Sequence, residues 1–321
     1  MAKPTGTFSR YEAVGIREDL QDMIYDISPT ETPFMSNIGR GKARNTYHEW
    51  QTDSLAAATA GNARIEGDDA VTNTASATSR LGNYTQIMTK TPRVTGTMEA
   101  VDKAGRRSEM SYQISKRGKE LKRDIESALC GTQAAAVGTA AGARELAGVG
   151  AWLWDNQKKK GTAATTVAVS SGAPTTDPTA GTAAVFTETD LKSVIADCWT
   201  DGGEPNMVLV GAFNKQTASG FSGIATQYRD NPQKGQATII GAADVYVSDF
   251  GTLNIVPSRF TPASNVYVLD TEYWEAAFLR PINQKPLAKT GDSEHRQILA
   301  EVTLCAKNPS SSGKVYTTTT S

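Results

Sequence analysis

The chain has 321 residues, long enough for two subdomains or one elongated domain, and 39% of them are hydrophobic without counting the 28 glycines. With glycine added, the apolar content approaches the roughly 45–50% of ordinary globular proteins, which excludes wholesale disorder. The 33 Lys and Arg nearly balance the 34 Asp and Glu, so the chain as a whole is no polycation and any contact with nucleic acid must be local.

The first 45 residues are predicted to form an arm without a core of its own. Apolar residues recur there at helical spacing and predict one short helix, at Ile16, Leu20, Met23, Ile24 and Ile27. Pro29 and Pro33 then interrupt the pattern, because proline removes a backbone donor and pushes the preceding residue out of the helical region. The arm therefore has to lie over another part of the molecule.

Residues 46–97 are predicted to form a long β-hairpin. Alternating and β-branched residues indicate extended strands at 46–50 and 84–97. The stretch 56–79 between them is rich in Gly, Ala, Thr, Asn and Asp, and its tip at 61–69 has too few large apolar residues to bury itself. We expect this tip to be mobile or to dock on another molecule.

A long helix is predicted from residue 99 to 130. One apolar stripe runs along it, formed by Met110, Ile114, Leu121, Ile125 and Leu129. At 1.5 Å per residue the helix would be roughly 45 Å long. Gly105 and Gly118 each weaken it by about 1 kcal/mol relative to alanine, so tertiary packing has to support it. A helix with a single apolar stripe lies on a sheet or on neighbouring molecules.

Residues 131–184 are dominated by Ala, Gly, Thr and Ser, apart from a Trp-Leu-Trp run at 152–154 and a lysine cluster at 158–160. This composition predicts a loop region with a short β-excursion at 165–169. Pro174 and Pro178 mark the region as an insertion or a boundary.

A second organised region begins at Thr187, which with Asp190 forms an N-cap pattern before an amphipathic helix. A buried strand at 207–210 and a short helix at 214–220 follow. Further strands are predicted at 245–248, 253–256, 265–269, 274–279 and 298–306, and Asp249-Phe250-Gly251 is predicted to join the first two as a hairpin turn. The Thr- and Ser-rich tail, 310–321, is expected to be frayed.

No residues have the spacing of a catalytic or cofactor site. His48 and His295 belong to no metal-ligand motif, the Gly-Lys pairs lack the upstream glycines of a phosphate loop, and no G-x-S-x-G elbow occurs. Asp68 and Asp69 are better explained as a solvated loop tip than as a cation site. We therefore predict no catalytic residue, no cofactor and no metal, and the chain is not expected to be an enzyme.

Cys130, Cys198 and Cys305 lie too far apart for a C-x-x-C motif, so they are interpreted as small buried hydrophobes in a reducing compartment. Residues 1–11 lack the apolar stretch of a signal peptide, and no run approaches the ~20 apolar residues that span a bilayer. We expect a cytoplasm-like location and no membrane partner.

The densest basic segment lies between residues 103 and 123, where only Glu109 and Glu120 oppose the positive charge. Its basic residues are Lys103, Arg106, Arg107, Lys116, Arg117, Lys119, Lys122 and Arg123. Such a strip binds phosphates without sequence preference, although a solvated helix face explains it about equally well.

Runs at both ends of the chain resemble one protein family. They are SPTETPF at 28–34 and WQTD at 50–53, and then YWEAAFLRP at 273–281, PLAKTGDSE at 286–294 and RQILAE at 296–301. The family is that of the major capsid (head) proteins of tailed double-stranded DNA bacteriophages. The resemblance implies an α+β protein with the HK97 capsid fold, whose parts are an N-terminal arm, an extended β-hairpin loop, a long spine helix, and peripheral and axial domains.

Mapped onto this chain, the resemblance implies an arm at 1–45, the extended hairpin loop at 46–97, and the spine helix, peripheral domain and insertion at 98–186. The axial domain would span 187–271, and returning peripheral strands and the tail 272–321. The pattern of elements gives the same order independently. Arm, hairpin and one-stripe helix each bury themselves poorly, which favours burial completed by neighbouring copies.

The implied function is a structural subunit that self-assembles into hexamers and pentamers, forming an icosahedral head around double-stranded DNA in the virion. Assembly is expected in the host bacterial cytoplasm, with a scaffolding protein, a portal protein and, as an open option, a cement or decoration protein as partners. A separate scaffolding protein is implied because Met1 leads almost directly into the arm. The alternatives are an encapsulin-like bacterial compartment and, less favoured because no nucleophile and base are found, a hydrolase.

If the basic strip faces packaged DNA, its candidate contacts are Arg106, Arg107, Lys116, Lys119 and Arg123. Helical spacing is expected to spread them over more than one face, so that only a subset meets DNA. Contacts to phosphates position a protein without reading bases, and no sequence preference is expected.

Overall fold

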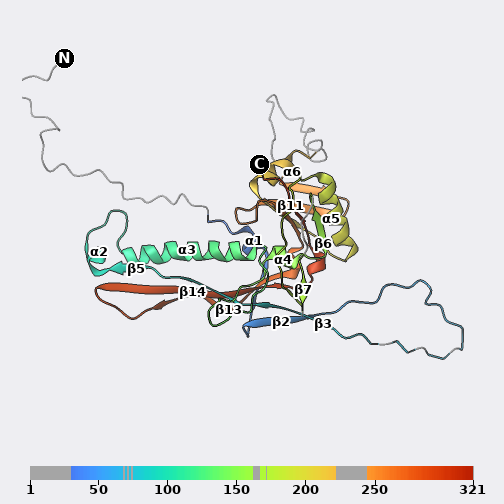
Figure 1. Ribbon diagram of the computed structural model, residues 1–321, viewed down its shortest axis with the longest axis horizontal. Helices are drawn as coiled ribbons and strands as arrows, with labels where there is room; N and C mark the ends of the chain where they lie inside the picture. Colours follow the sequence, from blue (N-terminus) through green and yellow to red (C-terminus); the bar gives the residue numbers. More distant parts are fainter. Residues whose placement is uncertain are drawn as a thin grey trace, which may run out of the picture.

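A computed structural model describes residues 30–67, 69–70, 72–73, 75–161, 167–170, 172–221 and 244–320. The helix expected near residues 16–27 and the side chain of Asp68 lie outside these residues. Figure 1 shows an elongated molecule in which a long helix lies along a long sheet, a compact α/β unit stands at one end, and an extended loop runs away from the body.

The elongated sheet, in the described residues, has five strands in the order β1-β13-β14-β4, with β5 pairing to the start of β14. β1 is parallel to β13 and the remaining pairs are antiparallel. The strands are β1 (Gly39–Lys42), β4 (Gln86–Lys90), β5 (Arg93–Thr95), β13 (Trp274–Pro286) and β14 (Ser293–Ala306).

The long helix α3 (Glu109–Leu129) packs on this sheet through the predicted apolar stripe. Leu121, Ile125 and Leu129 are fully buried against a core that includes Ala300 and Val302 of β14. Burying each such side chain contributes about 1.5–3 kcal/mol, enough to offset the cost of Gly118 in the helix interior. The prediction of a one-stripe helix lying on a sheet is confirmed.

The predicted helix start at residue 99 was wrong, because two helices share that segment. The short helix α2 (Gly96–Ala100) ends before Gly105, whose φ of 73° is a left-handed conformation that a continuing helix cannot contain. α3 then begins behind Ser108, whose side chain accepts a hydrogen bond from the backbone N–H of Ser111.

The predicted hairpin is present, but its second strand lies earlier than expected. β2 (Tyr47–Thr52) pairs antiparallel with β3 (Ser79–Tyr84). Residues 84–97 were expected to continue this hairpin and instead form β4 and β5, which pair with β14. The chain changes sheets at Thr85, whose N–H still bonds to Thr46 O at 2.8 Å while its hydroxyl donates to the buried carboxylate of Glu301 at 2.8 Å.

The compact unit is built on a sheet with the strand order β10-β11-β9-β12-β15-β6. Its strands are β6 (Asn156–Lys159), β9 (Met207–Val210), β10 (Val245–Ser248), β11 (Gly251–Pro257), β12 (Asn265–Leu269) and β15 (Gly313–Tyr316), and its helices are α5 (Glu188–Thr200) and α6 (Ala212–Ser219). The capping box of Thr187 and Asp190 and the turn at Asp249 and Phe250 form as predicted.

The expectation of a frayed tail was wrong, because β15 pairs with β12 on one side and with β6 on the other. All four of its residues are buried, and Val315 belongs to the core under α5. Two-sided pairing outweighs the polar composition that suggested fraying.

The region 131–184 is also more ordered than its composition predicted. It contains α4 (Val149–Trp152), β6, and a small ladder of β7 (Val169–Ser170) with β8 (Ala173–Pro174). The fully buried Trp152 stacks between Trp50 and Trp154 at centroid distances of 5.3 and 5.2 Å. This region therefore supplies part of the main core, while residues 165 and 166 of the expected β-excursion lie outside the described part of the chain.

The remaining helical segments of the described residues are short. They are α1 (Pro33–Asn37) and the 3₁₀ turns η1 (Thr271–Tyr273) and η2 (Pro309–Ser311). Pro33, expected to interrupt a helix, is the first residue of α1, where the missing N–H of proline costs nothing.

Candidate assembly and nucleic-acid interface

Three of the five candidate DNA contacts share one helix face, and the other two lie outside the helix. Lys116, Lys119 and Arg123 are spaced i, i+3, i+7 on α3, which places them within about 60° of one another. Their face is opposite the stripe that packs on the sheet. Arg106 and Arg107 precede α3 in its connection to α2. Helical spacing therefore keeps these three cations together, and the break between α2 and α3 separates Arg106 and Arg107 from them.

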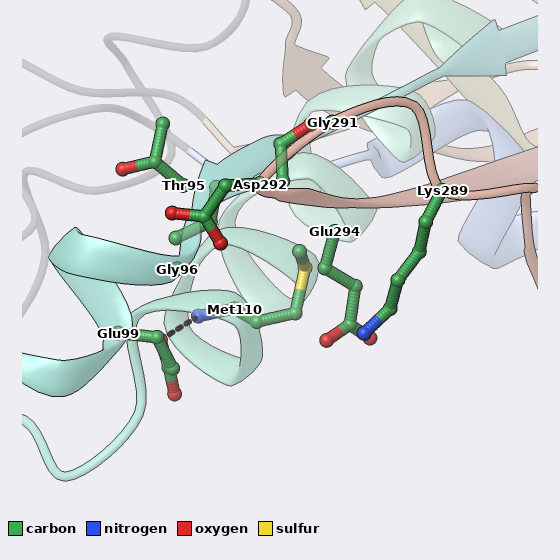
Figure 2. A pocket seen from close by; sticks show the side chains of 10 residues that line it. Thr95, Gly96, Glu99, Met110, Lys289, Gly291, Asp292 and Glu294 are labelled. Carbon is green, nitrogen blue, oxygen red and sulfur yellow. Dashed lines mark hydrogen bonds between the residues drawn. The ribbon is translucent and has the colours of Figure 1, made fainter.

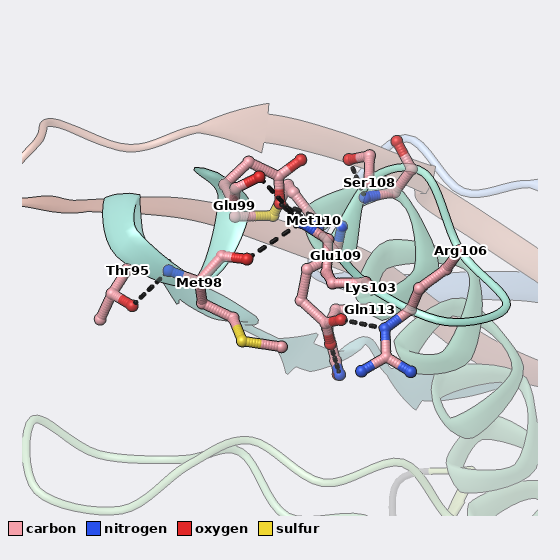
Figure 3. Close-up of polar contacts among 10 residues, drawn as sticks. Thr95, Met98, Glu99, Lys103, Arg106, Ser108, Glu109, Met110 and Gln113 are labelled. Carbon is pink, nitrogen blue, oxygen red and sulfur yellow. Dashed lines mark hydrogen bonds and ion pairs between the residues drawn. The ribbon is translucent and has the colours of Figure 1, made fainter. Parts of the chain in front are cut away.

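The surroundings of these cations differ. The Arg106 guanidinium forms an ion pair with Glu109 and lies 5.2 Å from the Tyr112 ring centroid, so it has a structural role (Figure 3). Arg123 stacks on Phe260 at 5.9 Å, and its buried Nε has no hydrogen-bond acceptor among the described residues. Arg107, Lys116 and Lys119 are exposed.

The connection between α2 and α3 is a tightly bonded tip at the far end of the molecule. One oxygen of Glu99 accepts the N–H groups of Glu109 and Met110 at 3.0 and 3.3 Å, and so caps the start of α3 (Figure 3). Hydrogen bonds from Ser108 and these two amides lower the pKa of Glu99. Lys103 Nζ donates to the carbonyls of Met98 and Glu99 at 2.9 and 2.8 Å, which closes the tip.

A cavity of about 240 Å³ lies under this tip, between α2, α3 and the turn that joins β13 to β14. Glu99, Asp292 and Glu294 supply carboxylates to its lining, with Lys289 beside them and Met110 as an apolar wall (Figure 2). The volume is below the roughly 300–1,000 Å³ of ordinary ligand pockets. The cavity suits a single side chain better than a cofactor.

The described root of the arm is fastened to α3 by one buried carboxylate. The two oxygens of Glu126 accept the N–H groups of Phe34 and Met35 at 2.7 and 2.8 Å. The Phe34 ring meets Trp274 edge-on at 6.2 Å, and both side chains are buried. Burial raises the pKa of Glu126.

The extended hairpin is rooted in a second buried carboxylate. Glu301 is only 3% exposed and accepts from Arg144, Arg280 and Thr85 at 2.7, 2.7 and 2.8 Å. From this root the loop beyond β2 and β3 runs away from the body (Figure 1). Leu55 and Ile65 in it are 98% and 78% exposed, so the prediction that the loop does not bury itself is confirmed for its described residues.

An exposed aromatic pair marks the surface of the compact unit. Trp199 at the end of α5 packs against Phe250 in the β10–β11 turn at 5.2 Å, and the side chains are 55% and 41% exposed. Val247 of β10 is 60% exposed. Large exposed aromatic and aliphatic side chains are typical of protein contact surfaces.

The histidines and cysteines are placed as packing residues. His295 Nε2 lies 2.9 Å from Ser293 Oγ, and the His48 ring lies 5.9 Å from Trp50. All three cysteines are buried free thiols, as predicted, and burial raises the pKa of Cys198 and Cys305 to about 12. Over the described residues no three His, Cys, Asp or Glu side chains gather to hold a metal, and no described helix is long and apolar enough to cross a membrane.

Comparison with known proteins places this geometry in one family. The family model described as SU10 major capsid protein matches residues 3–320. The major capsid protein of Escherichia phage Phieco32 is 29% identical over 357 residues, covering 99% of this chain and 98% of that protein.

Solved structures agree on the fold. A chain of the Cyanophage A-1(L) capsid superposes with a TM-score of 0.69 at 12% identity, covering 95% of this chain and 98% of that one. A chain from the Phage G gp27 major capsid proteins and gp26 decoration proteins gives 0.53 at 11% identity, covering 98% and 99%. The expected HK97 capsid fold is thereby confirmed.

Proposed function

Because this chain belongs to the SU10 major capsid protein family, we propose that it assembles with copies of itself into hexamers and pentamers of an icosahedral phage head. The head would enclose double-stranded DNA, and assembly would take place in the host bacterial cytoplasm. The role is that of a building unit, and neither a cofactor nor a metal enters the proposal. An encapsulin-like compartment is not favoured, because the family model and the related protein are both phage capsid proteins.

The observation that carries self-assembly is the extended loop, which holds exposed apolar side chains far from any core of its own chain. We propose that it docks on an adjacent subunit, where Leu55 and Ile65 become buried. The Trp199–Phe250 pair and the α2–α3 tip are further surfaces suited to contacts between copies.

The five-part division of the chain is proposed in the same terms, with one adjustment. Residues 1–45, 46–97, 98–186, 187–271 and 272–321 serve as arm, extended loop, spine helix with peripheral domain, axial domain and returning strands. β6 and β15 lie outside 187–271 but pair within the six-stranded sheet, so the axial domain takes in both strands.

The DNA-facing surface is proposed to be the outer face of α3. Lys116 and Lys119 are exposed on that face, which supports a common contact with phosphates, whereas Arg123 on the same face stacks on Phe260 and contributes less. Arg107 is exposed beside it, whereas Arg106 is held by Glu109 and contributes less. Scaffolding, portal and decoration proteins are the proposed protein partners; the Phage G capsid structure with its decoration proteins supports the last of these.

Assembly is tested directly with the purified full-length chain, alone and with a scaffolding partner. Light scattering and negative-stain microscopy should show capsomers or closed shells. A stable monomer at high concentration under both conditions would contradict the proposal.

A further inference from the structure

The edge strand β1 and the two residues after it carry a basic pattern that belongs to no phosphate-loop motif. From Gly39 the chain reads Gly-Arg-Gly-Lys-Ala-Arg, so small residues alternate with Arg40, Lys42 and Arg44. Successive side chains of a strand point to opposite faces. Arg40 and Lys42 of β1 therefore share one face, about 7 Å apart along the strand, and Arg44 follows two residues beyond its end.

Packing explains why the intervening residues are small. A Cβ atom on Gly41 would lie 1.3 Å from the carboxylate of Glu275 on the neighbouring strand β13, and Ala43 is only 1% exposed. Larger side chains therefore have room on the other face alone. Arg40, Lys42 and Arg44 are all exposed.

The register of β1 shows that this face is the α3 side of the sheet. Arg40 pairs with Ala276, and Lys42 with Phe278. Ala276 belongs to the core that also contains Leu121 and Ile125 of α3, and Phe278 packs against the same core. The β1 cations thus project on the side of the sheet where the long helix lies.

One exposed lysine of α3 lies on the flank of the helix next to α1. Asp124 of α3 bonds Lys90 of β4 at one flank of the helix, and Glu126 binds α1, which leads directly into β1, on the other flank. At 100° per residue, Lys122 lies on the flank of Glu126 and is exposed. Lys122 therefore lies on the same side of the helix as α1, from which the chain enters β1.

The β1 cations are not neutralised within the described part of the chain. Lys90, Arg117 and Arg144 each have a carboxylate partner at 2.6–2.7 Å, whereas Arg40, Lys42 and Arg44 form no ion pair with any described residue. The segment 36–46 also exposes no large hydrophobic side chain. A protein interface needs an apolar centre, so an unpaired cationic row without one fits a polyanion better.

We propose that Arg40, Lys42 and Arg44, with Lys122, form a binding stripe for the phosphate backbone of duplex DNA. The stripe extends the DNA-facing surface of α3 and rests on the proposed function. From Arg40 to Arg44 an extended chain spans about 14 Å, the axial length of about four base pairs. Contacts of this kind position the duplex without reading its sequence.

The test compares two full-length triple variants that lose the same charge. Arg40→Gln, Lys42→Gln and Arg44→Gln remove the stripe, while Lys158→Gln, Lys159→Gln and Lys285→Gln remove three exposed lysines elsewhere. Fluorescence anisotropy with a mixed-sequence duplex of about 30 base pairs, at several salt concentrations, measures the log–log dependence of affinity on salt. Relative to the unmodified chain, we expect the magnitude of this slope to decrease by about 2–3 in the stripe variant and by less than about 1 in the control variant.

Equal slopes in the two variants would overturn the stripe. If the stripe variant then also failed to form shells, its cations would serve a protein partner or protect the sheet edge from mispairing. Shell formation by the unmodified chain separates this inference from the proposed function. Normal shells with equal slopes refute the stripe alone, whereas no shells from the unmodified chain refute the proposed function.

Discussion

Lys314 in the buried strand β15 should make the stability of the subunit depend on pH. The side chain is fully buried, its Nζ donates to Gly150 O at 2.6 Å and lies 4.9 Å from the Tyr316 ring centroid. Burial lowers the pKa of Lys314 from 10.5 to about 7. At 1.36 kcal/mol per pKa unit, keeping this lysine charged in the fold costs up to roughly 5 kcal/mol.

The direction of the pH dependence follows from the difference in the pKa of Lys314 between the folded and the unfolded chain. The charged form is disfavoured only in the folded state, so the full cost applies below pH 7 and fades as pH rises from about 7 toward 10.5. Lys314→Met removes this cost but leaves Gly150 O without its donor, a loss of about 1–3 kcal/mol. We expect the variant to be more stable than the unmodified chain by about 3 kcal/mol at pH 6. At pH 10 we expect it to be equally stable or less stable by about 1 kcal/mol.

Urea unfolding of unassembled protein, followed by tryptophan fluorescence, measures this difference at both pH values. Lys158→Met is the matched control, because Lys158 on the neighbouring strand β6 pairs with Val315 and is exposed. Its effect should be small and the same at both values. A Lys314→Met effect that did not change between pH 6 and 10 would refute the assigned cost of burying the charge.

Three further outcomes are expected. Glu126→Gln replaces one acceptor of the Phe34 and Met35 amides by a donor, so it should destabilise the subunit by about 1–3 kcal/mol and speed proteolysis near the arm root. The control Asp124→Asn should do neither. Equal proteolysis of the two variants would contradict the role of Glu126 in holding the arm. Amide exchange across residues 53–78 should be fast in free subunits and slow in shells, and equal rates would argue against docking. Trp199→Ser should change the free energy of unfolding by less than about 1 kcal/mol and yet reduce the yield of shells. An unchanged yield would show that the Trp199–Phe250 pair is not a contact between subunits.

The parts of the fold that the sequence predicted are those with strong local signals. The apolar stripe of α3, the capping box at Thr187 and the turn at Phe250 each depend on residues close together in the chain. The resemblance at the two ends supplied the family and the fold, and the family model and the solved structures confirm both.

The errors arose where partners lie far apart in sequence. β15 was predicted to be part of a frayed tail, because its polar composition does not indicate that β12 and β6 pair with it on both sides. The lysine cluster at 158–160 was assigned to a loop for the same reason, because no local signal shows that β6 pairs with β15. The helix was predicted about ten residues too long because periodicity does not register a single glycine with positive φ, here Gly105.

The basic stripe on β1 was missed for a different reason, although its signal is local. Glycine next to lysine was tested only as part of a phosphate loop, which requires a following Ser or Thr. The informative feature is the period of two, because in an extended chain it collects every cation on one face while the small residues meet Glu275 and the sheet. A strand at the edge of a sheet can carry such a row only if one face is packed by residues this small. The same steric demand that fixes Gly41 therefore also fixes where the positive charge points, toward the side of the sheet that bears α3 and its own exposed lysines.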